Sequence, residues 1–354
     1  MANNYGSDNK SALEAKIDAQ KIAFAPIVFQ AVKSLRNLGI LELLDKNQNG
    51  MTPEEIAKQI QISKYGIKVL LDAGLSAEVV ILTDNKYQLT KTGFYFLNDK
   101  MTNINMDFVN DVCYNGMFYL EDSIKKEKPE GLKVFGNWPT IYHGLSKLHE
   151  NVKKSWFAFD HFYSDNVFIS ILPLIFKNNP KRILDVGGNT GKFALQCVKY
   201  NPDVETTIMD LPGQLKVALK NAKDNGYQNQ IKNYPADILD HSKPFPKGFD
   251  VIWMSQFLDC FSEEDILQIL KKAVESMSEN TSLFILETYW NRQEYDISTF
   301  CLNNTSLYFT AMANGNSRMY HSEDMINLIE KAGLKIKDIR DNLGISHTLI
   351  ECKK

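Results

Sequence analysis

The pattern of apolar and polar residues is most regular from residue 180 onward, where short apolar runs alternate with amphipathic stretches. The apolar runs have the length of buried strands, and the amphipathic stretches have helical spacing. The expected strands are RILDVGG, VETTIMDL, IKNYPADIL, FDVIWMS, SLFILET and SHTLIECK, and the expected helices are GKFALQCVKYN, PGQLKVALKNAKDNG, SEEDILQILKKAVESM and SEDMINLIEKAG. This alternation predicts an α/β domain with a Rossmann-like, doubly wound and mainly parallel sheet that binds ligands at its carboxyl edge.

The N-terminal pattern is different and predicts a small helical module. Residues 11–45 carry apolar side chains at three- and four-residue spacing, which indicates a helix. Thr52 is placed to cap a second helix, with Glu55 three residues later. Residues 63–80 predict another helix, and residues 79–93 predict two short strands around a polar turn. The order of helix, helix and hairpin is that of a winged helix.

A winged helix raises the question of DNA binding. The helix that would read a DNA groove offers only Lys64 and Lys68, opposed by Asp72, and it has no arginine. A groove-reading helix normally carries a denser set of basic residues. The module is therefore expected to serve dimerisation or scaffolding, with no nucleic acid as partner.

Between these two regions, the chain is helical and rich in aromatic residues, as in SWFAFDHFYSDN. Most of these rings are expected in a core, and some beside an apolar substrate. The expected division is residues 1–100 as the winged-helix-like dimerisation domain, 101–170 as a helical linker that contributes to the substrate pocket, and 171–354 as the Rossmann-like domain.

Composition narrows the possible classes further. The 354 residues are 44% hydrophobic and carry a formal net charge of −3, which argues against a general polyanion binder. No apolar run reaches the roughly 20 residues needed to span a bilayer, and the polar N-terminus lacks the apolar core of a signal peptide, so a cytoplasmic location is expected. The five scattered cysteines include no CxxC pair, so neither a zinc site nor a disulfide framework is expected.

The stretch ILDVGGNTGKFA is the most informative motif. An apolar strand ends at Asp185, and Gly187, Gly188 and Gly191 surround a tight turn before the next helix. Glycines allow a sharp turn and close approach of the backbone to a ligand. The pattern D-x-G-G-x-x-G is neither the dinucleotide fingerprint nor a phosphate-binding loop with its lysine and serine.

Two further carboxylates end the next strands. Asp210 in TTIMDLP lies 19 positions beyond Gly191, where a carboxylate accepts the hydroxyls of a ribose. Asp237 in PADIL follows the next expected strand and is placed to meet an adenine amino group. Each aspartate alone is compatible with a solvated strand end or a helix cap, but three in sheet order indicate a nucleoside site.

These residues carry a resemblance to a known family. LDVGGNTGKFALQCVKYNPDVETTIMDLP, followed by ADIL and FLDCFSEED, resembles the class I S-adenosylmethionine-dependent O-methyltransferases of the plant caffeate and acetylserotonin type and their bacterial relatives. The resemblance covers nearly the whole chain. It implies S-adenosyl-L-methionine as cofactor, S-adenosyl-L-homocysteine as product, and a homodimer in which the N-terminal module closes over the partner's substrate pocket.

The resemblance also implies roles for individual residues of the cofactor site. Asp185 and the loop glycines Gly187, Gly188 and Gly191 would face the methionine part. Asp210 would hold the ribose with Leu211 beside the adenine, and Asp237 and Ile238 would hold and flank the adenine. Phe261 stands where the family usually has a tryptophan, and Ser255 where many members have a lysine.

The catalytic residues depart from the family. Asp259 occupies the position of the family's histidine base, Glu287 matches the first supporting glutamate, and Ser317 is nearest to the second. Two explanations compete. Either Asp259 is the base, its pKa raised by burial beside Glu287, or the electrophilic cofactor needs little base help and Asp259 only orients substrate or caps the helix at SEED.

The resulting interpretation is a cytosolic, homodimeric methyltransferase that transfers a methyl group in line, without metal, to a small aromatic or polyene-like hydroxyl compound. His161, Tyr308 and Met312 are candidates for substrate contact, and His143 and His149 are weaker ones. Methylation at carbon or nitrogen stays open at this point. So do a cofactor-binding dimer that no longer methylates and a winged-helix regulator that senses a small molecule.

Overall fold

The computed structural model describes residues 6–240 and 242–354, and its internal contacts divide the chain into two compact units. The first unit ends at Val109, and the second runs from Asn110 to Lys354. No helix in the described residues is long and apolar enough to cross a membrane.

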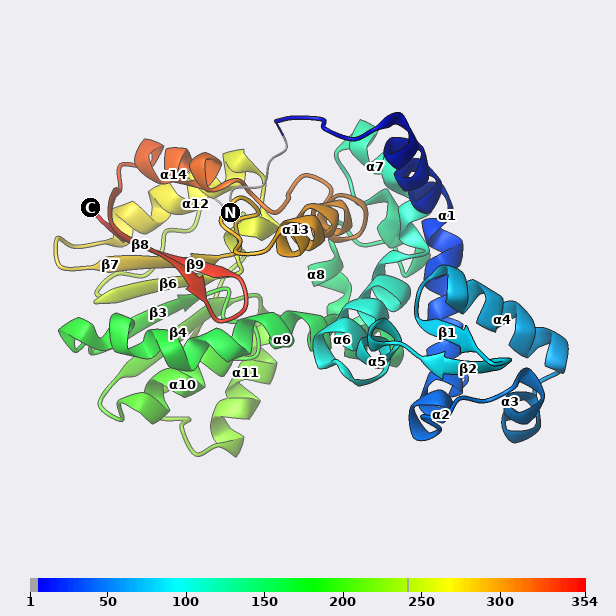
Figure 1. The fold of residues 1–354 in the computed structure, drawn as a ribbon. Coiled ribbons are helices and arrows are strands. Elements are labelled where there is room, and N and C mark those ends of the chain that lie inside the picture. Colours follow the sequence, from blue (N-terminus) through cyan, green and yellow to red (C-terminus); the bar gives the residue numbers. More distant parts are fainter. Residues whose placement is uncertain (1–5, 241) are drawn as a thin grey trace. The chain divides into compact units, whose positions relative to one another are not determined.

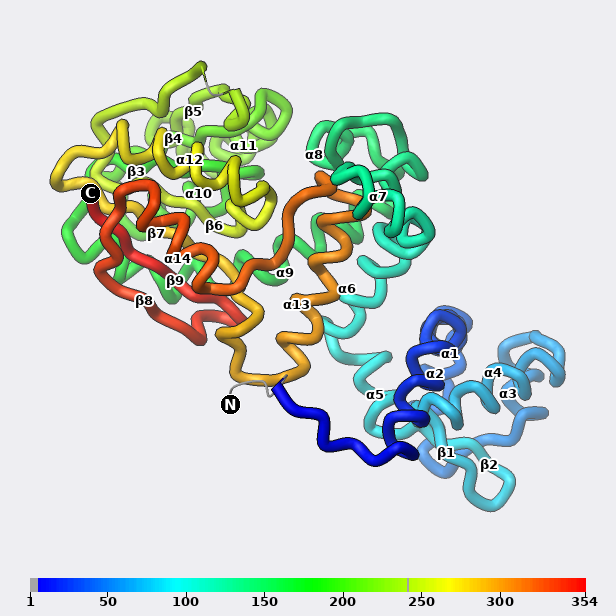
Figure 2. Tube along the Cα trace, turned by 90° about the horizontal axis from the view of Figure 1, so that it is seen from above, coloured from blue at the N-terminus to red at the C-terminus, as the bar shows by residue number. Residues whose placement is uncertain are grey.

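The N-terminal unit contains six helices and one hairpin among its described residues (Figure 1). They are α1 (Ala12–Asn37), α2 (Ile40–Lys46), α3 (Pro53–Ile60), α4 (Lys64–Ser76), β1 (Val80–Thr83), β2 (Lys86–Leu89), α5 (Lys91–Asn98) and α6 (Lys100–Phe108). The expected order of helix, helix and hairpin is confirmed, and the hairpin is seen beside α2 in Figure 2. Its apolar core is built from residues such as Leu35, Leu41, Ile56, Ile67 and Leu71, all with no exposed surface.

Local signals explain how these helices begin and end. The side-chain oxygen of Thr52 accepts from the backbone N–H of Glu55, and the Glu55 carboxylate accepts from the backbone N–H of Thr52 at 2.8 Å, so the expected cap of α3 is confirmed. The continuous helix expected over residues 11–45 is wrong in one respect. Gly39 has a φ of 77°, a left-handed conformation that glycine adopts without strain, and it separates α1 from α2.

The C-terminal unit starts with a run of short helical segments and one long helix. These are a π-helical turn (Val109–Cys113), 3₁₀ turns at Gly116–Tyr119, Glu130–Val134 and Leu145–Lys147, α7 (Leu120–Lys126), α8 (Ile141–Gly144) and α9 (Glu150–Ile175), which a 3₁₀ turn at Phe176–Asn178 follows. Helix α9 carries much of the aromatic stretch that the sequence places between the two regions.

A seven-stranded sheet forms the centre of this unit, with strand order β5-β4-β3-β6-β7-β9-β8. Its strands are β3 (Arg182–Val186), β4 (Glu205–Asp210), β5 (Ile231–Pro235), β6 (Val251–Ser255), β7 (Ser282–Glu287), β8 (Lys335–Leu343) and β9 (His347–Lys353). Strands β3 to β7 are parallel, whereas β9 pairs antiparallel with β7 and with β8. Six strands are those expected from the sequence, and β8 was not expected because its exposed face makes KIKDIRDNL strongly polar.

Helices cover both faces of the sheet (Figure 1). Helices α9, α10 (Lys192–Tyr200) and α11 (Pro212–Asp224) pack on one face, and α12 (Glu263–Ser276) and α14 (Ser322–Lys331) pack on the other. Helix α13 (Asp296–Tyr308) and a π-helical turn (Phe309–Ala313) lie between β7 and α14 in the chain. Because side chains alternate along a strand, Trp253 of β6 packs in the core under α9, α10 and α11, whereas Met254 packs in the core under α12 and α14.

Candidate active site

The glycine loop connects β3 to α10 in a backbone conformation that few other residues adopt. Gly187 and Gly191 have φ values of 72° and 77°. A Cβ atom on Gly187 would lie 2.2 Å from the ring of Phe257, and one on Gly188 would lie 2.6 Å from Oδ2 of Asp185. Both the backbone conformation and the lack of room for a side chain therefore require glycine in this loop.

A partly open cavity adjoins this loop. Its lining includes Asp185, Gly187, Gly188 and Ser255 among the residues expected at the cofactor site. Oδ2 of Asp185, Oγ of Ser255 and Oε1 of Gln256 are buried and have no hydrogen-bond partner within the protein. Burial, reinforced by the charge of Asp210, raises the pKa of Asp185 to about 8. Buried polar atoms without partners mark a place where a polar ligand fits.

Asp210 lies at the carboxyl end of β4 and is hydrogen-bonded to Asn189, which lines the cavity. Its Oδ2 atom accepts the backbone N–H of Asn189 at 2.8 Å, and its Oδ1 atom accepts the backbone N–H of Leu211 at 2.6 Å. Burial raises its pKa, and these two hydrogen bonds oppose the rise. A carboxylate has about four acceptor sites, so Asp210 retains capacity for ligand hydroxyl groups.

The loop after β5 carries Asp237 and Ile238, which do not line this cavity. Asp237 is exposed and accepts the backbone N–H of Leu239 at 3.0 Å. The carbonyl of Ile238 accepts a hydrogen bond from the buried ammonium of Lys272 on α12 at 2.7 Å, and the carbonyl of Asp240 accepts from the same group at 3.3 Å. Lys272 thus ties this loop to the helix layer.

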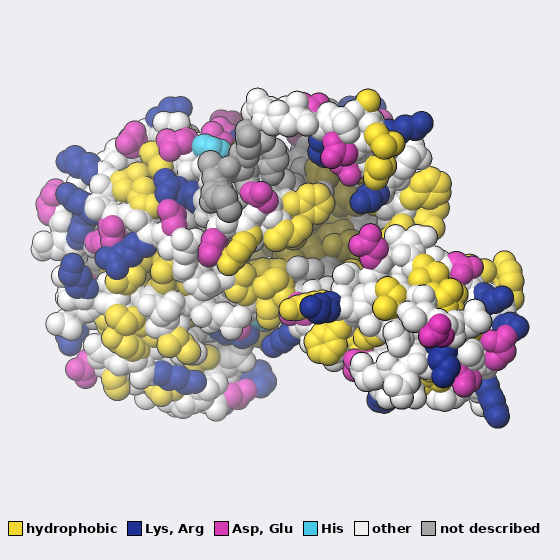
Figure 3. All heavy atoms as spheres, in the orientation of Figure 1, with side chains coloured by type: hydrophobic (Ala, Val, Ile, Leu, Met, Phe, Trp, Pro, Cys, Tyr) yellow, Lys and Arg dark blue, Asp and Glu magenta, His cyan; other side chains and the backbone are white. Residues whose placement is uncertain are grey.

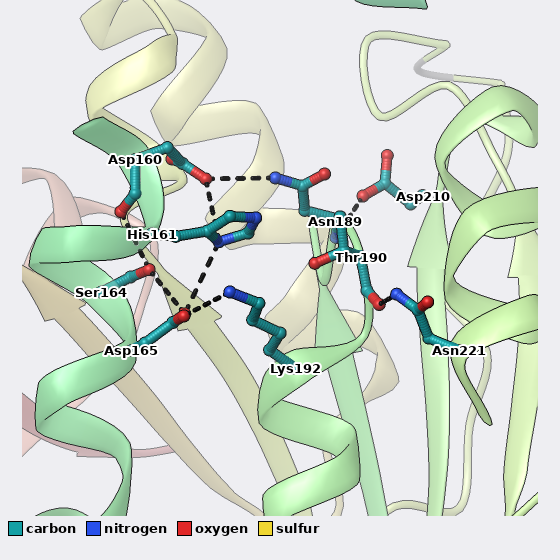
Figure 4. A network of polar contacts seen from close by, with 9 residues as sticks. All are labelled: Asp160, His161, Ser164, Asp165, Asn189, Thr190, Lys192, Asp210 and Asn221. Carbon is teal, nitrogen blue, oxygen red and sulfur yellow. Dashed lines mark hydrogen bonds and ion pairs between the residues drawn. The ribbon is translucent and has the colours of Figure 1, made fainter. Parts of the chain in front are cut away.

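A network of charged side chains from α9 meets the glycine loop across the cavity (Figure 4). Nδ2 of Asn189 donates to Oδ2 of Asp160 at 3.3 Å, and the ammonium of Lys192 pairs with Asp165. Nδ1 of His161 lies 3.7 Å from Asp160 Oδ2 and 3.6 Å from Asp165 Oδ1.

Of this network, only His161 was expected near substrate from the sequence. The signal for Asp165 was its position four residues after His161, because residues four apart share one face of a helix. The other two histidines lie apart: the exposed His143 of α8 is hydrogen-bonded to Thr140, and His149 is the exposed residue before α9.

Asp259 and Glu287 are brought together at the carboxyl ends of β6 and β7. Asp259 is 5% exposed and Glu287 is 1% exposed. Oε1 of Glu287 accepts the backbone N–H groups of Phe257 and Leu258 at 3.0 and 2.9 Å, and its Oε2 atom has no partner. Burial raises the pKa of Asp259 to about 7, helped by the charge of Asp160. Burial and the charge of Asp259 also hold the pKa of Glu287 well above its ordinary range.

The helix cap at SEED is not Asp259. Helix α12 begins at Glu263, and the residue that caps it is Ser262, whose hydroxyl oxygen accepts the backbone N–H of Asp265 at 3.2 Å. Asp259 belongs to a separate 3₁₀ turn, Leu258–Cys260, and its side chain receives a weak contact from the Cys260 thiol at 3.5 Å. The capping explanation for Asp259 is therefore wrong.

Other candidate residues surround this turn to different degrees. Tyr308 is buried, and its hydroxyl oxygen accepts from Nε1 of Trp156 at 2.7 Å. The ring of Phe261 packs edge-on against the ring of Phe257, with 4.9 Å between the ring centroids. Ser317 donates to Asn314, whose side chain donates to the carbonyl of Cys260.

Met312 lies among glycines rather than at the cavity. It is fully buried, and a Cβ atom on Gly116 or Gly131 would collide with its sulfur. Its side chain does not belong to the cavity lining.

Comparisons with known proteins identify the class. The family model for an O-methyltransferase domain matches residues 118–335, and that for a Dimerisation2-like domain matches residues 16–87. The chain belongs to the O-methyltransferase family. It is an S-adenosylmethionine-dependent methyltransferase with an N-terminal dimerisation domain.

Individual relatives are distant in sequence but similar over most of their length. The L-tyrosine C(3)-methyltransferase of Streptomyces lavendulae is 22% identical, over 90% of this chain and 88% of that protein. The caffeic acid 3-O-methyltransferase of Medicago sativa is 24% identical, over 77% of each chain. The structure of the mitomycin 7-O-methyltransferase MmcR superposes with a TM-score of 0.71 at 15% identity, covering 97% of this chain and 98% of that one. These likenesses agree with the architecture described above.

Proposed function

We propose that the enzyme methylates a phenolic hydroxyl group on a small aromatic acceptor and that Asp259 removes the phenolic proton. The observation that carries this proposal is the buried Asp259 carboxyl beside Glu287 at the carboxyl edge of the sheet, with a pKa of about 7. A general base is most effective when its pKa lies near the working pH. Asp259 meets this condition without the histidine that the family uses.

Each carboxyl group of the pair has a separate task in this proposal. Glu287 stays protonated because its pKa is well above the ordinary range, and it holds the backbone of Phe257 and Leu258 through Oε1. The turn that carries Asp259 is thereby fixed. Asp259 ionises near neutrality and accepts the proton as the phenol becomes a nucleophile.

The residues around the cavity fit S-adenosylmethionine, which supplies an electrophilic methyl group when bound. We assign Asp185, Gly187, Gly188 and Ser255 to its methionine part, because their unpartnered oxygens and close backbone suit its charged amino-acid end. The remaining assignments are Asp210 to the ribose, Leu211, Asp237, Ile238 and Phe261 to the adenine side, and Gly191 to the turn itself.

A second candidate is methyl transfer to a ring carbon beside the phenol. It is favoured by the similarity to an L-tyrosine C(3)-methyltransferase over 90% of the chain. Deprotonation of a phenol activates the adjacent ring carbon as well as the oxygen, so the same base serves both reactions.

Assembly into a homodimer is proposed from the dimerisation domain and from exposed apolar side chains. On α1, Leu13, Ile22 and Ile27 are 68%, 74% and 66% exposed. Figure 3 shows apolar side chains at the surface of both units. Two-fold dimers are the commonest closed assemblies. Light scattering at micromolar concentration is expected to give twice the chain mass of 40.4 kDa, and a monomeric mass would contradict the dimer.

The test of function is release of S-adenosylhomocysteine by the purified enzyme over a panel of phenols and their methyl ethers. Phenols are expected to react and methyl ethers, which have no proton to remove, are not. NMR of the product separates methylation of oxygen from methylation of carbon. A panel in which no phenol reacts, under conditions where the enzyme binds the cofactor, would overturn the proposal.

A further inference from the structure

The surroundings of Asp259 contain aromatic rings and carboxyl groups from distant parts of the chain. We call Tyr142, Trp156, Asp160, Asp259 and Tyr308 the acceptor-side cluster. Trp156 and Asp160 are four residues apart on α9, so they share one helix face, and Trp156 donates to Tyr308. Asn314, six residues after Tyr308, donates to the carbonyl of Cys260 in the turn that holds Asp259, and the side chain of Tyr142 is hydrogen-bonded to that of Cys260. The charge of Asp160 raises the pKa of both Asp259 and Tyr308. These five side chains therefore surround one region beside the cavity.

The two buried carboxyl groups of this region, Asp259 and Glu287, have no cationic partner among the described residues. Among the described residues, no lysine, arginine or histidine forms an ion pair with Asp259 or Glu287. Lys192, which lines the same cavity as Asp160, is paired with Asp165. Asp160 accepts from Asn189 at 3.3 Å and lies 3.7 Å from the His161 ring nitrogen, so it is incompletely neutralised within the described residues.

Asp160 is the most exposed carboxyl group of the cluster. Its side chain is 30% exposed and lines the cavity, whereas Asp259 and Glu287 are buried. The region thus offers acceptors for a cation and aromatic faces on which a cation is also stabilised.

We infer that the acceptor carries an ammonium group near its aromatic ring, and that Asp160 selects it. This inference rests on the proposed function, since it concerns the same phenolic acceptor. An ammonium group next to Asp160 would neutralise that carboxylate and leave Asp259 free to take the phenolic proton. An acceptor with a carboxylate in the same place would face two like charges in a partly desolvated site, which is strongly unfavourable.

The test compares three phenols of similar shape that differ in charge: tyramine, 4-ethylphenol and 3-(4-hydroxyphenyl)propionate. The same three side chains on a catechol ring provide a second series. Within either series, the kcat/KM of the cationic acceptor is expected to exceed that of the neutral one by about tenfold or more, and the anionic acceptor is expected to be the poorest.

Variants then assign the preference to Asp160. Asp160→Asn is expected to bring the ratio of cationic to neutral kcat/KM to within about threefold of unity, and Asp160→Glu is expected to restore it. Asp165→Asn is the matched control, because that carboxylate lies on the same helix but is paired with Lys192. It is expected to leave the ratio unchanged.

Three results would overturn the inference while leaving the proposed function intact. The first is that the neutral or anionic phenol is the better substrate of the native enzyme. The second is that the ratio of cationic to neutral kcat/KM is the same in Asp160→Asn as in the native enzyme. The third is that Asp160→Asn raises the KM for S-adenosylmethionine equally with every acceptor, which would assign Asp160 to the cofactor. Failure of every phenol would instead overturn the proposed function. The ratio of cationic to neutral kcat/KM in the native enzyme is measured without any variant, so this part of the test remains valid if a variant misfolds.

Discussion

The proposed cofactor side and the proposed acceptor side of this enzyme differ in how their residues are positioned. The cofactor side follows the carboxyl edge of consecutive strands, and its glycines and Asp210 occur at fixed offsets in the sequence. The acceptor side joins α8, α9, the turn after β6, the end of β7 and α13, and its groups act through burial and mutual charge. Changes on the first side should therefore alter cofactor affinity, and changes on the second should alter rate, pH dependence and acceptor choice.

The largest expected effect is on turnover in Asp259→Asn. The substitution removes the proton acceptor while nearly keeping the shape, and loss of a general base costs roughly 10²- to 10⁴-fold in rate. Because the pKa of Asp259 is about 7, activity of the native enzyme should fall as the pH drops below neutrality. That acid limb should be absent in the variant.

Steady-state kinetics between pH 5 and 9 decide whether Asp259 is the base. The cofactor KM serves as the internal control, since Asp259 is not assigned to cofactor binding. Turnover within about tenfold of native, with an unchanged acid limb, would mean that the electrophilic cofactor and positioning suffice.

The same variant should be more stable than the native enzyme at alkaline pH. The pKa of Asp259 is raised by burial from an ordinary 3.8 to about 7, so the folded state favours the protonated form. Stability from that form is complete below about pH 4 and is lost as the pH rises through 7. At about 1.4 kcal/mol per pKa unit, the loss is roughly 4 kcal/mol at most.

Denaturant unfolding at pH 4.5 and pH 8 measures this difference. The Asn variant should gain free energy of unfolding relative to native at pH 8 and show little difference at pH 4.5. Asp203→Asn, at an exposed residue before β4, is the control. A pH-independent difference for Asp259→Asn would contradict a raised pKa.

Asp210→Ala is expected to change cofactor affinity on the proposed cofactor side. The substitution removes the expected ribose partner, and loss of charged hydrogen bonds should weaken S-adenosylhomocysteine binding by about 2 kcal/mol, or roughly 30-fold. Asp203→Ala should bind normally. Calorimetry is the measurement, with thermal unfolding alongside because Asp210 also accepts two backbone N–H groups. Unchanged affinity would refute its assignment.

The glycine loop allows a steric test of the same side. Gly187→Ala places a methyl group 2.2 Å from the Phe257 ring at a φ of 72°, so something must move, at a cost of about 1–3 kcal/mol in stability and reduced cofactor affinity. Gly213→Ala, in α11, meets nothing within 4 Å and should be neutral or slightly stabilising. Equal melting temperatures for the two variants would show that the loop is not constrained as described.

The sequence predicted the glycine turn and the acidic strand end of the proposed cofactor side because these signals are local. A glycine turn after an apolar strand, and an acidic residue at the next strand end, are visible without the fold. Asp160 and Trp156 were not predicted, since their importance arises only when α9 packs beside the turn that holds Asp259. Strand β8 was not predicted for a related reason: its pairing with β9 stabilises a segment whose composition alone favours a loop.

The smallest expected effect concerns Lys272, which lies outside both sets of assigned ligand residues. Its buried ammonium donates to the carbonyls of Ile238 and Asp240 in the loop after β5. Lys272→Met keeps much of the side-chain length but leaves these carbonyls without their donor, which should cost about 1–3 kcal/mol in stability. If Asp237 and Ile238 flank the adenine, the loosened loop should also raise the cofactor KM about three- to fivefold with little change in kcat, an order-of-magnitude expectation for an indirect contact. Lys271→Met, at the exposed neighbouring position of α12, is the matched control and should change neither quantity. A destabilised Lys272→Met enzyme with a native cofactor KM would place the adenine away from this loop, and would confine the cofactor side to β3, β4 and the glycine turn.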